Sequence, residues 1–328
     1  MERQILVPLD GSALAEQALP HAVALAETMR RPLLLVRVVA TEAGIESFTW
    51  PAAVPAVAVL DPEIERKAAC EYLRATAAAL SERSGLVVTT RTLEGDPAAE
   101  IIRQAQRPGD TAVIVMATHG RSGVSRWFYG SVAERALQTA RAPILLIHAR
   151  PEVEPAPPPS YRTILVPLDG SAFASQALAP ARDLARALGA TVLLATVRPN
   201  SEDVGLAEAG RAPAWALDEA HLAGIRAEQA MHETVEWLAE EGVEARAIAC
   251  HGVPTAELVR LIAAERVDLV VMATHARGVL QRLWRGSVAL SVVQAGAAPT
   301  LLMHARHPVD PTQASIFANT GATLVVAP

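Results

Sequence analysis

The sequence is poor in cysteine and has no apolar run long enough for a membrane helix. Its 328 residues include only two cysteines, Cys70 and Cys250, which do not occupy matching places in the internal repeat described below. We therefore expect no disulfide framework. No uninterrupted apolar stretch approaches the roughly 20 residues that span a bilayer, and the first residues lack the basic and apolar segments of a secretory signal. We expect a soluble, cytoplasmic protein without a membrane partner.

An excess of positive charge is also missing. Lys and Arg number 29 against 35 Asp and Glu, a net charge of −6. Surfaces that bind nucleic acid are rich in basic residues, so we expect no nucleic-acid partner. The sequence also lacks G-x-x-x-x-G-K-[ST], a G-x-G-x-x-G after the first predicted strand, and G-x-S-x-G. This favours neither a Walker-type ATPase, nor a dinucleotide dehydrogenase, nor a hydrolase with a serine nucleophile elbow.

An internal repeat organises the chain. Residues 4–12 recur as residues 163–171 with eight of nine positions identical, and later motifs recur in the same order. We predict two copies of one domain, at residues 1–150 and 161–306. The proline-rich segment 151–160 between them favours an extended linker. Residues 307–328 form a tail with no counterpart in the first copy.

Apolar runs alternate with Ala-rich stretches of helical period in each copy, which is typical of βαβ units around a buried parallel sheet. The predicted fold is α/β, with two tandem doubly wound, Rossmann-like domains of five parallel strands each. The predicted strands are residues 4–9, 33–39, 86–92, 112–117 and 144–148, then 163–168, 191–197, 244–249, 268–273 and 300–304. The predicted helices are residues 12–30, 62–84, 97–107 and 131–141, then 172–188, 219–241, 255–265 and 287–295.

The loop Asp10-Gly11-Ser12 follows the first predicted strand and returns as Asp169-Gly170-Ser171. One interpretation places Asp10 at the strand tip against the polar edge of a ligand, beside the free N–H groups of the next helix. The other makes Gly11 a turn and Ser12 an N-cap. For Ser12 the second interpretation is favoured, and Asp10 fits either.

The second repeated loop leads from the fourth predicted strand to Gly130-Ser131. Gly120, Gly130 and the N–H groups of Ser131 and Val132 are suited to a concave phosphate site at a helix N-terminus, with Arg121 and Arg126 adding charge. A capping box, Ser131 to Glu134, explains the serine without a ligand. The second copy keeps Gly286-Ser287 but has Leu290 in place of that glutamate, which weakens the second explanation.

Together these residues resemble the universal stress protein family in its tandem, two-domain form. ATP-binding members carry G-x2-G-x9-G-[S/T] after the fourth strand and an aspartate after the first. The resemblance implies an adenine-nucleotide alpha-hydrolase-like fold and backbone contacts to adenine at Val38 and Val197. The nucleotide-binding residues implied for the first copy are Pro8, Asp10, Ser12, Val38, Met116, Ala117, His119, Gly120, Arg121, Gly130, Ser131 and Val132. Those of the second copy are Asp169, Ser171, Val197, Met272, Ala273, His275, Arg277, Gly286, Ser287 and Val288.

The two copies depart from the family motif to different degrees. The first glycine is Ala117 or Ala273, which strand dihedrals tolerate. The second glycine is kept as Gly120 but is Ala276 in the second copy. If that position needs a positive φ, alanine is strained there. We therefore expect ATP, carried with Mg²⁺, to bind more tightly in the first domain.

Neither copy shows catalytic or metal-binding residues. His119 and His275 have no partners at metal-ligand spacing, so no metal site is predicted. No general base is evident, and we expect at most slow ATP hydrolysis. The main hypothesis is an ATP-binding stress regulator that changes conformation or partner binding. The alternative is a scaffold or chaperone-like stress protein that binds no nucleotide. The fifth strands resemble the family's dimerisation edge, which suits a homodimer or a pairing of the two domains.

Overall fold

Runs of Val, Ile and Leu form the strands of two parallel sheets, one in each half of the chain. The computed structural model describes residues 3–40, 61–107, 111–118, 131–150, 159–198, 229–275 and 288–305. The chain divides into unit 1, residues 1–159, and unit 2, residues 160–328. The tail 307–328 and most of the linker 151–160 lie outside the described residues.

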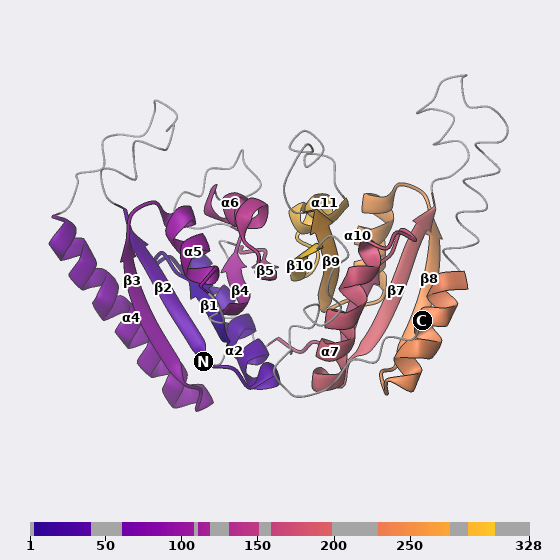
Figure 1. The fold of residues 1–328 in the computed structure, drawn as a ribbon, viewed down its shortest axis with the longest axis horizontal. Coiled ribbons are helices and arrows are strands. Elements are labelled where there is room, and N and C mark those ends of the chain that lie inside the picture. The colour runs from indigo at the N-terminus through magenta and orange to yellow at the C-terminus, as the bar shows by residue number, and fades with distance from the viewer. Residues whose placement is uncertain are drawn as a thin grey trace, which may run out of the picture. The chain divides into compact units, whose positions relative to one another are not determined.

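The sheet of unit 1 has the strand order β3-β2-β1-β4-β5, with neighbouring strands parallel (Figure 1). Its elements are β1 (Gln4–Pro8), α1 (Ala13–Glu16), α2 (Ala18–Met29), β2 (Leu33–Val39), α4 (Pro62–Ser84), β3 (Val88–Glu94), α5 (Pro97–Ala105), β4 (Thr111–Ala117), α6 (Ser131–Thr139) and β5 (Ile144–Ile147). Helix α4 packs along β2 and β3, and α5 packs against α6. Right-handed connections place α2 and α4 on one face of the sheet and α5 and α6 on the other.

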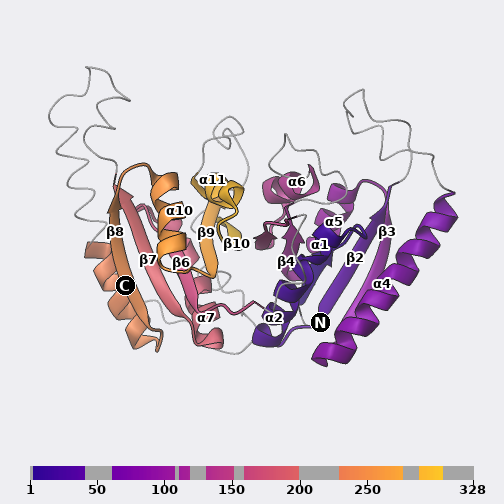
Figure 2. The same cartoon turned by 180° about the vertical axis from the view of Figure 1, so that it is seen from behind.

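Unit 2 repeats this topology with the strand order β8-β7-β6-β9-β10, again parallel (Figure 2). Its elements are β6 (Thr163–Pro167), the 3₁₀ helix η1 (Ala174–Ala177), α7 (Leu178–Leu188), β7 (Thr191–Arg198), β8 (Ala245–His251), α10 (Pro254–Ala264), β9 (Leu269–His275), α11 (Val288–Ala295) and β10 (Thr300–Ala305). A further helix covers residues 229–240, and residues 219–228 of the helix predicted at 219–241 lie outside the described part of the chain.

The central strands are buried on both faces, which explains their continuous apolar sequence. Ile5, Leu6 and Val7 of β1 are inaccessible to solvent, as are Ile164 and Leu165 of β6. Helices cover both faces of each sheet, so alternate residues of the central strands are not exposed to solvent. The predicted fold class, two tandem Rossmann-like α/β domains, is thus confirmed. Within the described residues, no helix is both long and apolar enough to span a membrane.

The first predicted helix of each copy is wrong as a continuous helix, because a proline interrupts it. In unit 1 the helix predicted over 12–30 is broken at Gln17 into α1 and α2. Pro20 has no N–H to donate to the carbonyl of Glu16, and its ring crowds that carbonyl. In unit 2 the helix predicted over 172–188 begins as η1, and Pro180 stands four residues after Gln176.

The third strand of each sheet lies later in the sequence than predicted. The strand predicted at residues 86–92 is observed as β3 at Val88–Glu94. The strand predicted at residues 244–249 is observed as β8 at Ala245–His251. Pairing decides these limits, since β3 follows β2 residue by residue to the pair Val39 and Glu94. Val87 is 67% exposed just before β3. Because Val87 is apolar although it is exposed, the start of β3 was predicted too early.

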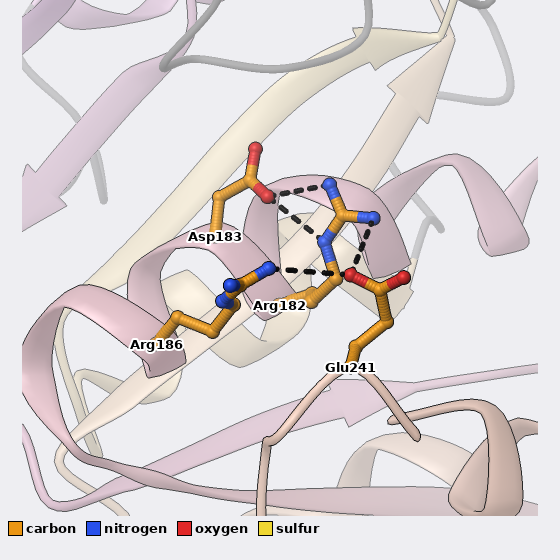
Figure 3. A network of polar contacts seen from close by, with 4 residues as sticks. All are labelled: Arg182, Asp183, Arg186 and Glu241. Carbon is orange, nitrogen blue, oxygen red and sulfur yellow. Dashed lines mark hydrogen bonds and ion pairs between the residues drawn. The ribbon is translucent and has the colours of Figure 1, made fainter. Parts of the chain in front are cut away.

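Unit 2 contains an ion-pair network, centred on the buried Arg182, that links α7 to the end of helix 229–240. The Nη2 and Nε atoms of Arg182 donate to Asp183 Oδ1 at 2.6 and 2.9 Å, and Glu241 Oε2 lies 3.6 Å from its Nη1. Figure 3 shows the guanidinium between the two carboxylates, with Arg186 reaching Glu241 from the side at 3.3 Å. Arg182 also lies over the Trp237 ring, 5.4 Å from its centroid. In unit 1 the positions of Arg182 and Asp183 hold Val23 and Ala24.

Candidate functional site

The loop after β1 is a tight turn in which one carboxylate oxygen holds the serine. Asp10 Oδ1 accepts hydrogen bonds from Ser12 N at 2.9 Å and from Ser12 Oγ at 2.6 Å. Ser12 Oγ in turn accepts from Ala15 N at 3.2 Å, so Ser12 is the N-cap of α1. Gly11 has a φ of 83°, a left-handed conformation that favours glycine. The structure thus shows the capping role of Ser12 and gives Asp10 the role of fixing that cap.

The loop after β6 has the same geometry. Asp169 Oδ1 accepts from Ser171 N at 2.9 Å and from Ser171 Oγ at 2.6 Å, and Ser171 Oγ accepts from Ala174 N at 3.1 Å. Gly170 has a φ of 80°. Both turns therefore leave the second oxygen of their aspartate out of the serine interaction. This matched geometry places a carboxylate at the same point of the two sheets.

The ends of β1 and β4 lie at one edge of the sheet, because these strands are parallel neighbours. The order in which successive strands are added to the sheet reverses between β1 and β4. Doubly wound folds bind ligands at such a switch point. Pro8 ends β1 and is buried, and Val38 lies near the end of the adjacent β2. Met116 and Ala117 end β4, and α6 begins with Ser131 and Val132.

Unit 2 brings the matching elements together in the same way. Asp169 and Ser171 follow β6, Val197 lies near the end of β7, and Met272, Ala273 and His275 belong to β9. Helix α11 begins at Val288. Outside the described residues lie the remaining predicted contacts: His119, Gly120, Arg121 and Gly130 in unit 1, and Arg277, Gly286 and Ser287 in unit 2. Their roles stay predictions.

Arg37 adds a positive charge behind the first loop that the sequence did not reveal. A Cβ placed on Gly11 would lie 3.0 Å from Arg37 Nη1, so the guanidinium lies against the glycine. The guanidinium stands over the ring of Tyr72, 5.2 Å from its centroid. Tyr72 Oη donates to Glu16 Oε1 at 2.7 Å, and burial and this carboxylate raise the Tyr72 pKa. In unit 2 the place of Arg37 is taken by the buried Thr196.

A second unpredicted pair joins the start of α5 to the middle of α6. Asp96 Oδ1 caps α5 by accepting from Ala99 N at 2.8 Å. Arg135 Nη1 lies 2.9 Å from Asp96 Oδ1 and 2.7 Å from Oδ2. Asp96 is 39 residues from Arg135 in sequence, and no local motif indicates such a pair. The proline after Asp96 signals the helix start, but only the packing of α5 on α6 selects Arg135.

The described residues show no group of three or more His, Cys, Asp or Glu side chains that could hold a metal ion. Cys70 and Cys250 are both free thiols. The Cys70 Sγ lies 3.2 Å from Thr92 Oγ1, and burial raises the pKa of the Cys250 thiol. The Cys250 thiol therefore lacks the lowered pKa of a reactive cysteine.

Comparison with known proteins identifies relatives of both units. The sequence profile of the universal stress protein family matches residues 1–148 and 160–304. The chain is 24% identical over 324 residues to a universal stress protein of Mycolicibacterium smegmatis, covering 93% of this chain and 98% of that one. It is 30% identical over 145 residues to a universal stress protein of Methanocaldococcus jannaschii, covering 44% of this chain and 81% of that one. Among solved structures, a universal stress protein from Archaeoglobus fulgidus matches with a TM-score of 0.67 and 18% identity, covering 92% and 98%.

Proposed function

The chain belongs to the universal stress protein family, and from that premise we propose that it is an ATP-binding regulator whose nucleotide state sets its conformation or its partner binding. The observation that carries this proposal is the pair of matched turns, in which Asp10 and Asp169 are fixed by their serines at the ligand-binding edge. A capping turn needs a carboxylate or a serine, but not both, since either one serves as an N-cap. Because the serine of each turn is the cap, the aspartate suits contact with the ribose of a bound nucleotide.

The start of α6 supports the phosphate side of the proposal. This helix begins at Ser131 directly after the segment that carries Gly120 and Gly130. Its first N–H groups have no partners within the helix, and the helix dipole favours anions there. In this proposal Gly130, Ser131 and Val132 bind the phosphate chain through their backbone, and Val38 lies beside the adenine.

The chemistry of the site supports binding rather than turnover. In this proposal the Asp10 carboxylate, which is fixed by Ser12, contacts the ribose and is not assigned to activate a water. A general base must reach the attacking water with a free lone pair and a suitable pKa. We propose at most slow hydrolysis, with Mg²⁺ entering on the nucleotide and keeping most of its waters. ATP then acts as a ligand that stabilises one state of the protein.

Linkage shows that such a ligand is sufficient for a switch. At a nucleotide concentration a hundred times the dissociation constant, binding stabilises the bound state by about 2.7 kcal/mol. That free energy changes a two-state equilibrium by about a hundredfold. The proposal also includes a cytoplasmic location, where ATP is available, and pairing of the β5 and β10 edges in a homodimer or within one chain.

Calorimetric titration of nucleotide-free protein with Mg-ATP tests the proposal. We expect one tight site per chain in unit 1 and a weaker one in unit 2, because Ala276 replaces a glycine that unit 1 keeps as Gly120. Gly130→Asp should remove the tight site, and Gly286→Asp the weak one. Melting curves without ligand show whether each variant is folded. No heat at several temperatures, with no nucleotide released from the purified protein, would replace the proposal by the scaffold interpretation.

A further inference from the structure

The ion pair between Asp96 and Arg135 connects two helices that both begin at the ligand-binding edge of unit 1. One nitrogen of Arg135 lies within 2.9 Å of both carboxylate oxygens of Asp96. The side chain of Asp96 is 15% exposed and that of Arg135 is 43% exposed. Partial burial reduces the screening that makes most surface ion pairs weak.

Asp96 is fixed before Arg135 reaches it. Its Oδ1 accepts from Ala99 N and caps α5, and the backbone N–H of Glu100 donates to Asp96 O at 3.0 Å. The carboxylate therefore has a set position relative to α5. Since Arg135 is four residues after Ser131, its side chain arises one turn into α6. The pair thus holds the first turn of α6 against a rigid point.

The other ends of the same two helices are also joined. Gln106 Nε2 donates to the carbonyl of Thr139, the last residue of α6, at 3.2 Å. The two helices pack against each other, and Ile101 of α5 and Ala133 and Leu137 of α6 are buried. The two polar contacts lie at the two ends of α5 and reach the middle and the last residue of α6, so they fix the direction of α6 as well as its position.

Unit 2 lacks the groups that make this pair. Val253 takes the place of Asp96 before α10, and no side chain caps that helix. Ser291 takes the place of Arg135 in α11. Val253 is 58% exposed. The two units therefore share the fold and the Asp-Gly-Ser turns but differ in what holds the helix that follows the fourth strand.

We propose that the Asp96–Arg135 pair positions the first turn of α6 to receive the phosphates of the nucleotide, and that it makes unit 1 the tighter site independently of Gly120. This inference rests on the proposed function. Arg135 is a positioning residue, since it acts through α6 and not on the ligand. Preorganised N–H groups bind an anion without a further ordering cost. The pair should therefore matter most for ligands that carry several phosphates.

The test compares Arg135→Met with a matched variant, Arg103→Met. Arg103 is 68% exposed and pairs with Glu100 within α5, so its loss removes the same charge from a neighbouring helix without touching α6. Both variants are made in the full chain carrying Gly286→Asp, so that titration with nucleotide reads unit 1. Asp96 is left unchanged, because its replacement would also remove the cap of α5. Hydrogen exchange of the amides of residues 132–136, without nucleotide, gives a readout that needs no ligand.

We expect Arg135→Met to weaken ATP binding about tenfold, a usual size for coupling between sites, and to weaken AMP binding less. Amides in the first turn of α6 should exchange faster than in the unmodified chain. Arg103→Met should change neither quantity, and Arg135→Lys should recover part of the affinity. A general loss of stability would lower the melting temperature but would not change the ratio of ATP to AMP affinity.

Three results would overturn the inference in distinguishable ways. Unchanged exchange in Arg135→Met would show that the pair does not hold α6, whatever the chain binds. Equal losses in Arg135→Met and Arg103→Met would show that only net charge matters. Faster exchange in a chain that binds no adenine nucleotide would end the proposed function and reduce the pair to a packing contact. As a gain-of-function check, Val253→Asp with Ser291→Arg should tighten the weaker site of unit 2.

Discussion

The guanidinium of Arg37 lies against Gly11, so that a side chain at residue 11 would require Arg37 to shift. A Cβ on Gly11 would lie 3.0 Å from Arg37 Nη1 and 3.3 Å from Cζ. Gly11 also has a φ of 83°, so two separate constraints select glycine. The contact links the Asp10 turn to β2 and, through Tyr72, to α4.

Gly11→Ala should therefore destabilise unit 1 by more than the strain of the turn alone. Strain at a positive φ costs about 1–2 kcal/mol, and displacement of Arg37 adds to it. Gly85→Ala is the matched control, because Gly85 has a φ of 69° and an added methyl group would meet nothing within 4 Å. Urea unfolding of both variants measures the difference. Equal losses would show that Arg37 moves freely away from the loop.

The buried cation of unit 2 leads to a second prediction. Arg182 lies between Asp183 and Glu241, with 9% of its side chain exposed. Arg182→Met removes the cation and leaves two carboxylates close together, which should cost about 3 kcal/mol of unfolding free energy. Arg186→Met removes an exposed arginine from the same network and should cost less than about 1 kcal/mol. The unfolding transition of unit 2 reports both values, and similar values for the two variants would contradict the assigned burial.

Stability should fall with acid through His21. Burial lowers the pKa of this histidine from 6.5 to about 4. Between these two pH values the unfolded chain binds a proton that the folded chain does not, so stability decreases as the pH falls from 6.5 towards 4. The loss attributable to this residue is at most about 3 kcal/mol. Unfolding curves of His21→Gln from pH 7 to pH 4 should show a shallower dependence of stability on pH than those of the unmodified chain.

The motif difference between the units gives a further prediction. Ala276 corresponds to Gly120, and Ala273 corresponds to Ala117. If alanine is strained at the second motif position, Ala276→Gly should tighten ATP binding in unit 2 by about tenfold. Ala273→Gly should leave the affinity nearly unchanged, because strand dihedrals suit alanine. Titrations in the Gly130→Asp background measure unit 2 alone. If Ala276→Gly did not raise the ATP affinity, the weaker binding of unit 2 would have another cause, such as the missing ion pair of α11.

The repeat and the apolar runs were enough to predict the fold. Residues 33–39 and 62–84 match β2 and α4 at both ends, because a buried strand and a capped helix carry their limits in their own sequence. Asp61 caps α4 and Gly85 ends it. The limits of β3 depend on its pairing with β2, which no local pattern specifies. The break at Gln17 had a local signal in Pro20, and the helical period of the surrounding residues outweighed it.

The site was predictable only where a single loop contains it. Asp10 and Ser12 are two residues apart, and their hydrogen bonds follow from one turn. Arg37 and Tyr72, or Asp96 and Arg135, come from separate elements, and their meeting depends on how helices pack across the sheet. An arginine on a strand or helix has many possible partners of similar energy. Its partner is therefore decided by tertiary structure.

The proline breaks have a mechanical consequence. Glu16 O lacks the N–H partner that an uninterrupted helix would supply at residue 20, so the turn with Ser12 is joined to α2 by fewer hydrogen bonds than the turns of α2 are to one another. Pro180 has the same effect in unit 2, although it aligns with His21 and not with Pro20. Prolines at two different positions thus remove a helical hydrogen bond at the same junction in each unit. A displacement of the aspartate turn should therefore be passed to the helix behind it less directly than through an uninterrupted helix.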